Sequence, residues 1–506
     1  MAERFFLQTS FLNGQSESDV SGGPGYFSKS YGIDIHTVPG VIRAAVAPVK
    51  EQDTAGFCKF AVDIGTSFGT TSGFQNSFWF DNSGNIYRRT TTTSLLNSWG
   101  TVFSTGTAGL LNTNGAWSFG NYLYWSTGTS VQRILLSDAA SNSQTWGSGS
   151  VTISWGQLNN STYHPSAVIG TYCLIGNGTT IASIDDTGTL TASGIPDVTL
   201  AFLPSNYEIT SLHKYDIDIL AGTKNKGGIS GSKLLRWDIS SPAFTQDIDV
   251  PENVVNNFLT TNNRTFLQAG NKGRIYEYNG VSISPFKKIP MLNSDTATEE
   301  ETLIFPQATT THQGIGYWGV SNKTGDTSFA IPGLYAFGRK NESYPISLSH
   351  QFVISSASND KQIGAIISGL FADSRVPYLL YSWRDNTLPS HGIDAVQNTI
   401  NKKSGVYFET QSIGGNRWLQ KTFGNYAISY RTKPSNTSIS LGYYKNFAST
   451  ASGSITLTDK SDYNVLVSNE KIEAGAMKFL VTLKTSGNDT AEIEGIYTDF
   501  NEKSVI

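Results

Sequence analysis

The chain carries acidic and basic side chains that could together cleave a glycosidic bond. A glycosidase needs two carboxyl groups a few ångströms apart, and a sialidase adds arginines that bind the carboxylate of its substrate. The candidate acids are Asp185, Asp186, Asp218, Asp238 and Asp373. The candidate arginines are Arg88, Arg133, Arg236, Arg274 and Arg339. Each arginine falls near the second strand of a repeated hairpin, so superposed repeats predict an arginine ring. The alternative is a ladder of arginines, each paired with an acid or carbonyl group of a neighbouring repeat.

Other catalytic signatures are missing from the sequence. The six histidines are scattered, without the HExxH spacing of a zinc enzyme, and no GxSxG motif is present. The Asp-box of sialidases, Ser-x-Asp-x-Gly-x-x-Trp, is also missing, because its nearest match at Ser183 to Gly188 is displaced by one residue and lacks the tryptophan. We therefore predict a protein that is not an enzyme and has no cofactor or metal, with a glycosidase as an alternative.

Two turns contain oxygen ligands that could bind Ca²⁺. They are Asp81-Asn82-Ser83-Gly84-Asn85 and Asp185-Asp186-Thr187-Gly188. Both are too short for the twelve-residue calcium loop, and both suit tight hairpin turns. The pattern favours turns without metal.

Four tryptophans lie outside the repeated hairpin pattern, in stretches rich in Gly, Ser and Asn. They are Trp99, Trp117, Trp146 and Trp155. Because aromatic faces stack on sugar rings, these residues could form a surface that binds a glycan or a protein partner. The alternative is that they pack between neighbouring repeats.

The elements that must position these residues are seven hairpins. In each, a short apolar strand is followed by a turn of Gly, Asn, Ser or Thr and by a second apolar strand. The hairpins recur at intervals of about 45–51 residues, at Trp79, Tyr124, Leu174, Ile219, Leu267, Trp318 and Ile366. A period near 50 built from hairpins predicts a radial array of four-stranded sheets, a β-propeller with seven blades.

The sequences on either side of the hairpins follow other patterns. Residues 1–50 predict an N-terminal arm, and the strand at 41–46 or the one at 60–64 is expected to close the propeller, which we place at 51–403. Residues 404–506 alternate apolar and polar positions in short strands, which predicts a C-terminal antiparallel β-sandwich. The predicted fold class is all-β throughout.

Composition excludes several classes of protein. Charged residues make up only 15% of the chain and the net charge is −4, so binding to nucleic acid or to an anionic membrane is not expected. The two cysteines, Cys58 and Cys173, are expected to be buried free thiols. Neither a signal peptide nor an apolar stretch of membrane-spanning length is recognisable, so we expect synthesis in the cytoplasm of a host cell.

Two segments carry a family resemblance. The phrase GIDIHTVPG at Gly32 to Gly40, just before the hairpins, and FLVTLKTSGNDTAEIEGIYTDF at Phe479 to Phe500 resemble virion proteins of tailed bacteriophages. The resemblance implies a non-enzymatic structural part of the tail, in its nozzle, tip, baseplate or fibre attachment. It implies location in the virion and assembly with copies of itself and with other tail proteins.

The low content of Lys and Glu agrees with such assembly, because these side chains lose much rotamer freedom at a contact. Two alternatives stay open. One is a receptor- or glycan-binding propeller on the particle surface, with a host-surface glycan as its partner. The other is a propeller glycosidase.

Overall fold

The structure is a computed structural model. It describes residues 3–8, 10–16, 25–64, 75–91, 97–104, 112–140, 146, 150–227, 231–289, 302–322, 331–356, 358, 360–370, 377–397, 401–413 and 420–502. Apart from the short helix α1 (Leu136–Ala139) and a 3-10 turn at Ser461–Tyr463, every described element is a β-strand, which confirms the predicted all-β class. Within these ranges no helix is long and apolar enough to cross a membrane.

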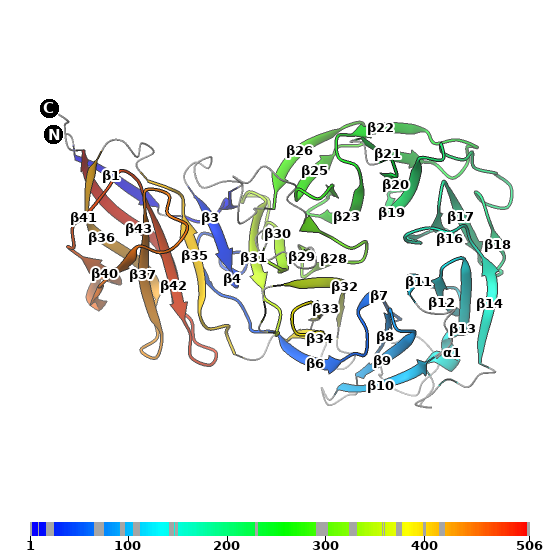
Figure 1. The fold of residues 1–506 in the computed structure, drawn as a ribbon, viewed down its shortest axis with the longest axis horizontal. Helices are drawn as coiled ribbons and strands as arrows, with labels where there is room; N and C mark the ends of the chain where they lie inside the picture. The colour runs from blue at the N-terminus through cyan, green and yellow to red at the C-terminus, as the bar shows by residue number, and fades with distance from the viewer. Residues whose placement is uncertain are drawn as a thin grey trace.

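Seven antiparallel sheets follow one another around a central axis, as Figure 1 shows. Sheet 1 contains β7 (Cys58–Asp63), β8 (Gln75–Asp81), β9 (Asn85–Thr91) and β10 (Asn97–Ser104). Sheet 2 contains β11 (Thr113–Phe119), β12 (Tyr122–Thr127), β13 (Ser130–Leu135) and β14 (Val151–Gln157). Sheet 3 contains β15 (Ser166–Ile169), β16 (Tyr172–Asn177), β17 (Thr180–Asp185) and β18 (Leu190–Thr191). Sheet 4 contains β19 (Tyr207–Tyr215), β20 (Asp218–Asn225), β21 (Ser232–Trp237) and β22 (Gln246–Val250).

The other three sheets complete this propeller-like unit. Sheet 5 contains β23 (Val255–Thr261), β24 (Arg264–Ala269), β25 (Arg274–Tyr278) and β26 (Ile283–Lys288). Sheet 6 contains β27 (Thr302–Leu303), β28 (Thr309–His312), β29 (Ile315–Asn322), β30 (Gly333–Gly338) and β31 (Ser347–Phe352). Sheet 7 contains β32 (Lys361–Leu370), β33 (Pro377–Asp385), β34 (Ser390–Gln397) and β6 (Val49–Asp53).

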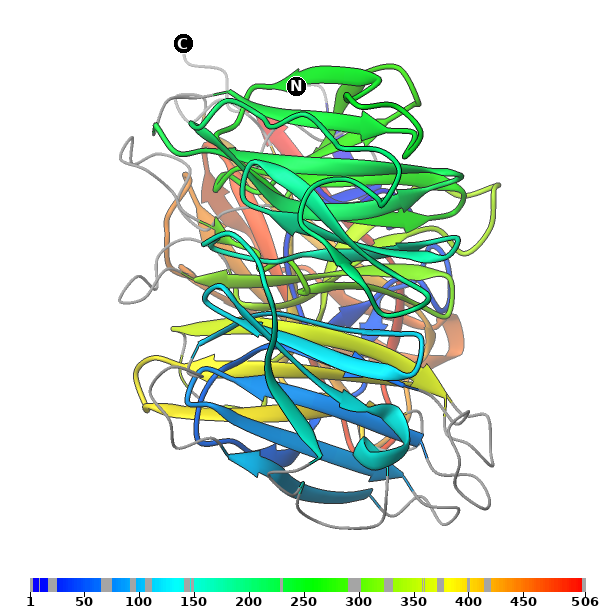
Figure 2. The same cartoon turned by 90° about the vertical axis from the view of Figure 1, so that its right-hand side faces the viewer.

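The innermost strands of neighbouring sheets contact one another. These contacts run from β7 through β11, β15, β19, β23 and β28 to β32, and β32 contacts β7. Gly364 on β32 permits this last approach, because a Cβ atom there would lie 1.9 Å from the carbonyl oxygen of Cys58 on β7. Seen from the side in Figure 2, the strands run between two faces, where the turns and links gather.

An N-terminal strand supplies the outer edge of sheet 7, but neither of the two predicted strands does so. The strand is β6, which pairs with β34. Of the predicted candidates, the one at 41–46 contributes β5 (Arg43–Ala44), which pairs with β4 (Ile33–Asp34), and the one at 60–64 lies mainly in β7. Strand β6 has the polar sequence VKEQD and is largely exposed, as suits an outermost strand. Strands were predicted from apolar stretches of the sequence, so this polar strand was not predicted.

Two six-stranded sheets form a second unit, which we call the two-sheet unit. One contains β1 (Glu3–Gln8), β43 (Glu492–Glu502), β36 (Lys421–Thr432), β40 (Val465–Ser468), β39 (Thr458–Lys460) and β41 (Ile472–Ala474). The other contains β2 (Gly14–Gln15), β3 (Tyr26–Tyr31), β35 (Val406–Thr410), β42 (Met477–Lys484), β37 (Ser438–Lys445) and β38 (Gly453–Ile455). The sheets share one apolar core, in which Tyr426 of the first lies 5.7 Å from Phe479 of the second between ring centroids.

The described N-terminal residues do not form the separate arm that the sequence predicted. Strand β1 pairs with β43, and β3 pairs with β35. Strand β2 in turn pairs with β3. The first three strands of the chain therefore belong to the sheets built mainly by its last hundred residues, and the chain enters the propeller-like unit only afterwards.

The two units join along β31, the outer strand of sheet 6. Strands β2, β3 and β4 contact it, and every residue of β31 is buried. The backbone N–H of His350 donates a hydrogen bond to the hydroxyl of Ser30 (2.9 Å), and the N–H of Gly32 donates to Nδ1 of His350 (3.1 Å). Tyr31 stacks on the same imidazole with a centroid separation of 5.3 Å. An edge strand that would otherwise be open is thus covered by the other unit.

Candidate functional site

One link within sheet 6, between β27 and β28, contacts the innermost strands of three other sheets. The side-chain oxygen of Gln307 accepts a hydrogen bond from the N–H of Ala61 on β7 (2.7 Å). Its amide nitrogen donates to the carbonyl oxygen of Ala116 on β11 (3.3 Å). Its own carbonyl oxygen accepts from the N–H of Ile366 on β32 (2.9 Å). The innermost strands of sheets 1, 2 and 7 are therefore joined through a single residue.

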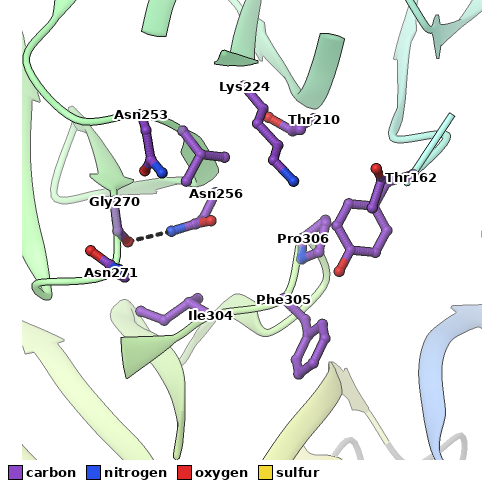
Figure 3. A pocket seen from close by; sticks show the side chains of 12 residues that line it. Thr162, Thr210, Lys224, Asn253, Asn256, Gly270, Asn271, Ile304, Phe305 and Pro306 are labelled. Atoms are coloured by element: carbon purple, nitrogen blue, oxygen red, sulfur yellow. Dashed lines mark hydrogen bonds between the residues drawn. The ribbon is translucent and has the colours of Figure 1, made fainter. Parts of the chain in front are cut away.

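A cavity of about 320 Å³ opens beside this link, and we call it the axial pocket (Figure 3). It is lined by strand residues, turns and links of the propeller-like unit. Lys224 comes from the end of β20, Asn253 from the link between sheets 4 and 5, and Asn271 from the turn between β24 and β25. Tyr163 and the apolar link residues 304–306 form the remaining wall.

The axial pocket has one cation and no carboxylate among its described lining residues. Figure 3 shows the side chain of Lys224 pointing into it. Glu208 is the cross-strand partner of Lys224, but its carboxylate accepts hydrogen bonds from the hydroxyl of Ser161 (2.8 Å) and the N–H of Thr162 and lies 3.7 Å from Lys226. The lining has the charge and amide groups that suit an anionic ligand, and its described residues do not include the acid pair that glycoside hydrolysis needs.

The predicted acids are used in turns and in an ion pair. Asp218 pairs with Arg236 (Oδ2 to Nε, 2.5 Å). Asp238 accepts hydrogen bonds from the N–H groups of residues 240 and 241, which lower its pKa. Asp185 accepts from the hydroxyl of Thr187 (2.7 Å) and from the N–H of residue 189, and these bonds lower its pKa. Asp186 is exposed in the same turn. Asp373 lies outside the described residues. None of the four described acids lines the axial pocket.

The five predicted arginines occur at matching places in their sheets. Four lie on the third strand, β9, β13, β21 or β25, and Arg339 directly follows β30. Arg274 lies 3.3 Å from Glu252, Arg88 donates to the carbonyl of residue 139 (3.2 Å), and Arg339 donates to the carbonyl of residue 342 (3.3 Å). Arg133 stacks over Trp155 at 4.5 Å. These contacts are local and favour separate arginines over a shared binding ring. The predicted pairing with a neighbouring repeat is seen for Arg88, and for Arg236, which donates to the carbonyl of residue 280 (3.4 Å), whereas Arg133 and Arg339 contact groups of their own sheets.

Two of the four predicted tryptophans are buried and two are partly exposed. Trp117 and Trp146 are each only 4% exposed and lie in apolar cores. Trp99 is half-buried, and its indole N–H donates to Glu51 (3.2 Å). Trp155 is half-buried beneath the guanidinium of Arg133. A buried ring cannot stack on a ligand, so the prediction is wrong for Trp117 and Trp146, which pack inside the propeller-like unit.

The turns considered for calcium satisfy their carboxylates internally. Asp81 accepts hydrogen bonds from the N–H groups of Ser83 (2.9 Å) and Asn85 (2.7 Å) and from the hydroxyl of Tyr87 (3.2 Å). Gly84 adopts φ = 85°, a conformation that suits glycine in a tight turn. Across the part of the chain that the structure describes, no cluster of three or more His, Cys, Asp or Glu side chains could hold a metal ion.

Comparison with known proteins gives a likeness of fold. No protein-family model matches the sequence, and no curated protein matches it. Similar solved structures include the extracellular domain of the putative one component system BT4673 from B. thetaiotaomicron, with 14% identity, a TM-score of 0.42 and coverage of 85% of this chain and 47% of that one. The chain thus spans about half the length of that structure.

Two further structures are similar at the same level. The N-terminal domain of Nup159 has 9% identity, a TM-score of 0.41 and coverage of 75% of this chain and 99% of that one. The Dos1 propeller has 9% identity, a TM-score of 0.40 and coverage of 78% and 97%. The likeness concerns a β-propeller-like fold and extends no further.

Proposed function

We propose that the chain is a non-enzymatic structural protein of a tailed-bacteriophage particle, built into its tail. In this proposal the propeller-like unit is a seven-bladed β-propeller and the two-sheet unit is a β-sandwich. The contact of β32 with β7 and the addition of β6 to sheet 7 support seven blades in one ring. The apolar core shared by the two six-stranded sheets supports the sandwich.

The observation that carries the proposal is the path of the N-terminal segment. Strands β1 to β3 complete the two-sheet unit, β4 lies on β31 at the junction, and β6 completes sheet 7. The chain therefore passes from the two-sheet unit into the propeller-like unit and back again, and β2, β3 and β4 pack against β31 where the units meet. A body fixed in this way presents its surfaces at constant positions, which suits a part that is assembled into a larger particle.

The edges and surface of the two-sheet unit offer contacts for assembly. Strand β1 is the outermost strand of its sheet, with one side unpaired by the described strands. Leu7 on this strand is 54% exposed. An exposed strand edge with an apolar side chain is a ready site for pairing with another chain, so copies of this protein or other tail proteins are the partners we propose.

The proposal is tested by locating the chain in particles. Antibodies raised against the purified protein should label the tail of intact phage particles in electron micrographs, and mass spectrometry should find the chain in gradient-purified particles in a fixed ratio to the capsid protein. A non-structural protein of the same phage serves as the control for carry-over. Absence of the chain from purified particles would exclude a structural role.

A second function, recognition of an acidic glycan, is favoured by the lone cation in the axial pocket. Amide side chains and a tyrosine beside Lys224 match the hydroxyl groups and the carboxylate of a uronic or sialic acid. We expect Lys224→Met to weaken binding to such glycans about tenfold or more. Lys214→Met, an exposed lysine on β19 of the same sheet, should leave it unchanged. The measurement is a glycan array followed by titration; equal binding by both variants would contradict this function.

A further inference from the structure

A second cavity lies between the propeller-like unit and the two-sheet unit, and we call it the junction pocket. Its volume is about 440 Å³, within the range of small-molecule sites. Sheet 6 contributes Arg339 and Lys340 at the end of β30, and the N-terminal segment contributes Arg43 on β5. Lys402 comes from the segment that leads from sheet 7 to the two-sheet unit. Sheet 6 and the two segments that run between the units therefore supply cations to one space.

Positive charge exceeds negative charge in this pocket. Its described lining contains four cationic residues and a single carboxylate, that of Asp34. Asp34 is already engaged, because it accepts hydrogen bonds from Nε of Arg43 (2.9 Å) and from the N–H groups of residues 36 and 37 (both 3.0 Å). Glu492, outside the lining, lies 3.8 Å from the same arginine. Lys402 interacts electrostatically with the carboxylates of Asp34 and Glu492, which already face Arg43. Three further cations, Arg339, Lys340 and Lys402, thus share the pocket with carboxylates that Arg43 engages.

The remaining bonds of these cations go to neutral groups. Lys340 donates to the carbonyl oxygen of Thr37 (2.6 Å), and Arg339 donates from Nη1 to the carbonyl oxygen of Glu342 (3.3 Å). Burial and the nearby guanidinium of Arg43 lower the pKa of Lys402. Like charges held together in a partly buried space repel one another, and an anion bound between them would relieve that repulsion.

Two buried nitrogen atoms of the lining have no hydrogen-bond partner among the described atoms. They are Nε of Arg339 and Nε2 of His36, and the imidazole as a whole is only 7% exposed. An unsatisfied buried polar atom costs about 1–3 kcal/mol, so folded proteins usually provide a partner. Together with the excess of cations, these atoms indicate that the pocket accepts a ligand with several acceptor oxygens.

We propose that the junction pocket binds a compact phosphate-bearing anion and that this ligand joins the two units. The planar fork of an arginine and the point charges of lysines are the groups that bind phosphoryl oxygens in proteins. The charge excess favours a ligand with two or more negative charges. Because the cations come from sheet 6 and from the two segments that run between the units, the bound anion should stabilise the chain against unfolding. This inference is independent of the proposed virion role.

The test is titration of the full chain with pyrophosphate, inorganic phosphate and glycerol phosphate, at low salt and neutral pH, by calorimetry and thermal unfolding. We expect pyrophosphate to bind and to raise Tm. Binding of pyrophosphate and inorganic phosphate without glycerol phosphate would assign the site to free phosphate species. Binding of all three would assign it to phosphate esters as well. No heat of binding and no shift in Tm at millimolar concentrations would overturn the proposal.

Variants test whether the pocket itself is responsible. Lys402→Met and Arg339→Met should each weaken pyrophosphate binding about tenfold or more. Lys460→Met, which removes an exposed cation of β39 far from the lining residues in sequence, is the matched control and should bind as the original chain does. Equal weakening in all three variants would show non-specific charge attraction and overturn the proposal. If Arg339→Met does not fold, Arg339→Lys is used instead. It keeps the positive charge and removes the planar guanidinium, so weaker binding of pyrophosphate by this variant would show that the guanidinium contributes to binding.

Discussion

Replacing Arg89 with methionine is expected to lower the free energy of unfolding by about 3–5 kcal/mol. Arg89 lies on β9 in sheet 1 and is 1% exposed. Its Nε and Nη2 donate to the two carboxylate oxygens of Glu51 at 2.8 and 3.1 Å. Since Glu51 lies on β6, the outer strand of sheet 7, the pair joins the last sheet to the first. Without the arginine, a buried carboxylate loses the cation that compensates its desolvation.

Urea unfolding followed by circular dichroism measures this effect, and the same strand offers a matched control. Lys50 on β6 pairs with Asp53 at 2.8 Å, but both side chains are exposed, so Lys50→Ala should cost less than about 1 kcal/mol. The double variant Arg89→Met with Glu51→Gln should recover part of the loss, because no buried charge is then left unpaired. A loss for Arg89→Met no larger than that for Lys50→Ala would show that the pair does not hold sheets 1 and 7 together.

Local patterning was sufficient to locate most of the sheets. The reference positions of the first six hairpins, from Trp79 to Trp318, all lie on the second strand of sheets 1 to 6. The seventh, Ile366, lies on β32, the first strand of its sheet. The stretch of sequence that forms sheet 7 supplies only three of its strands, because the outer strand is the N-terminal β6.

Pairing between distant segments could not be predicted in the same way. Strand β1 pairs with β43 from the other end of the chain, and no local periodicity encodes such a partner. The candidate sites depend on the same long-range arrangement. Asn253 and Asn271 look like ordinary turn residues in the sequence, and Arg43 and Lys402 meet only because both units fold against each other. Trp117 and Trp146 were predicted to be at the surface because their neighbours in the sequence are polar. Polar neighbours do not prevent a tryptophan from being buried between sheets.

Acidification is expected to weaken the junction through His350. This side chain is fully buried, and burial lowers its pKa to about 4. Its Nδ1 accepts a hydrogen bond from the N–H of Gly32, so Nε2 carries the proton and donates to the carbonyl of Pro332 (3.2 Å). Tyr31 and Tyr335 enclose the ring at centroid distances of 5.3 and 5.0 Å. A second proton on Nδ1 would face a hydrogen-bond donor inside a fully buried site.

The sign of the effect follows from which state binds the proton first. In the unfolded chain histidine has a pKa of about 6.5, so the unfolded state is protonated below that pH. In the folded state the imidazole of His350 becomes protonated only near pH 4. The stability that His350 contributes is complete above pH 6.5 and falls by about 3 kcal/mol by pH 4. The buried imidazoles of His36 and His312, also with pKa values lowered to about 4, add to the loss in the same window.

The share of His350 is isolated by comparing variants across pH. In His350→Gln, the loss of unfolding free energy between pH 7 and pH 4 should be smaller than in the original chain by about 3 kcal/mol. His391→Gln, which replaces a half-buried histidine of β34 away from the junction, should change that loss far less. Urea unfolding at a series of pH values gives both quantities. If His350→Gln and the original chain lose stability in parallel, the junction does not depend on a neutral imidazole, and its acid sensitivity must come from the other buried groups.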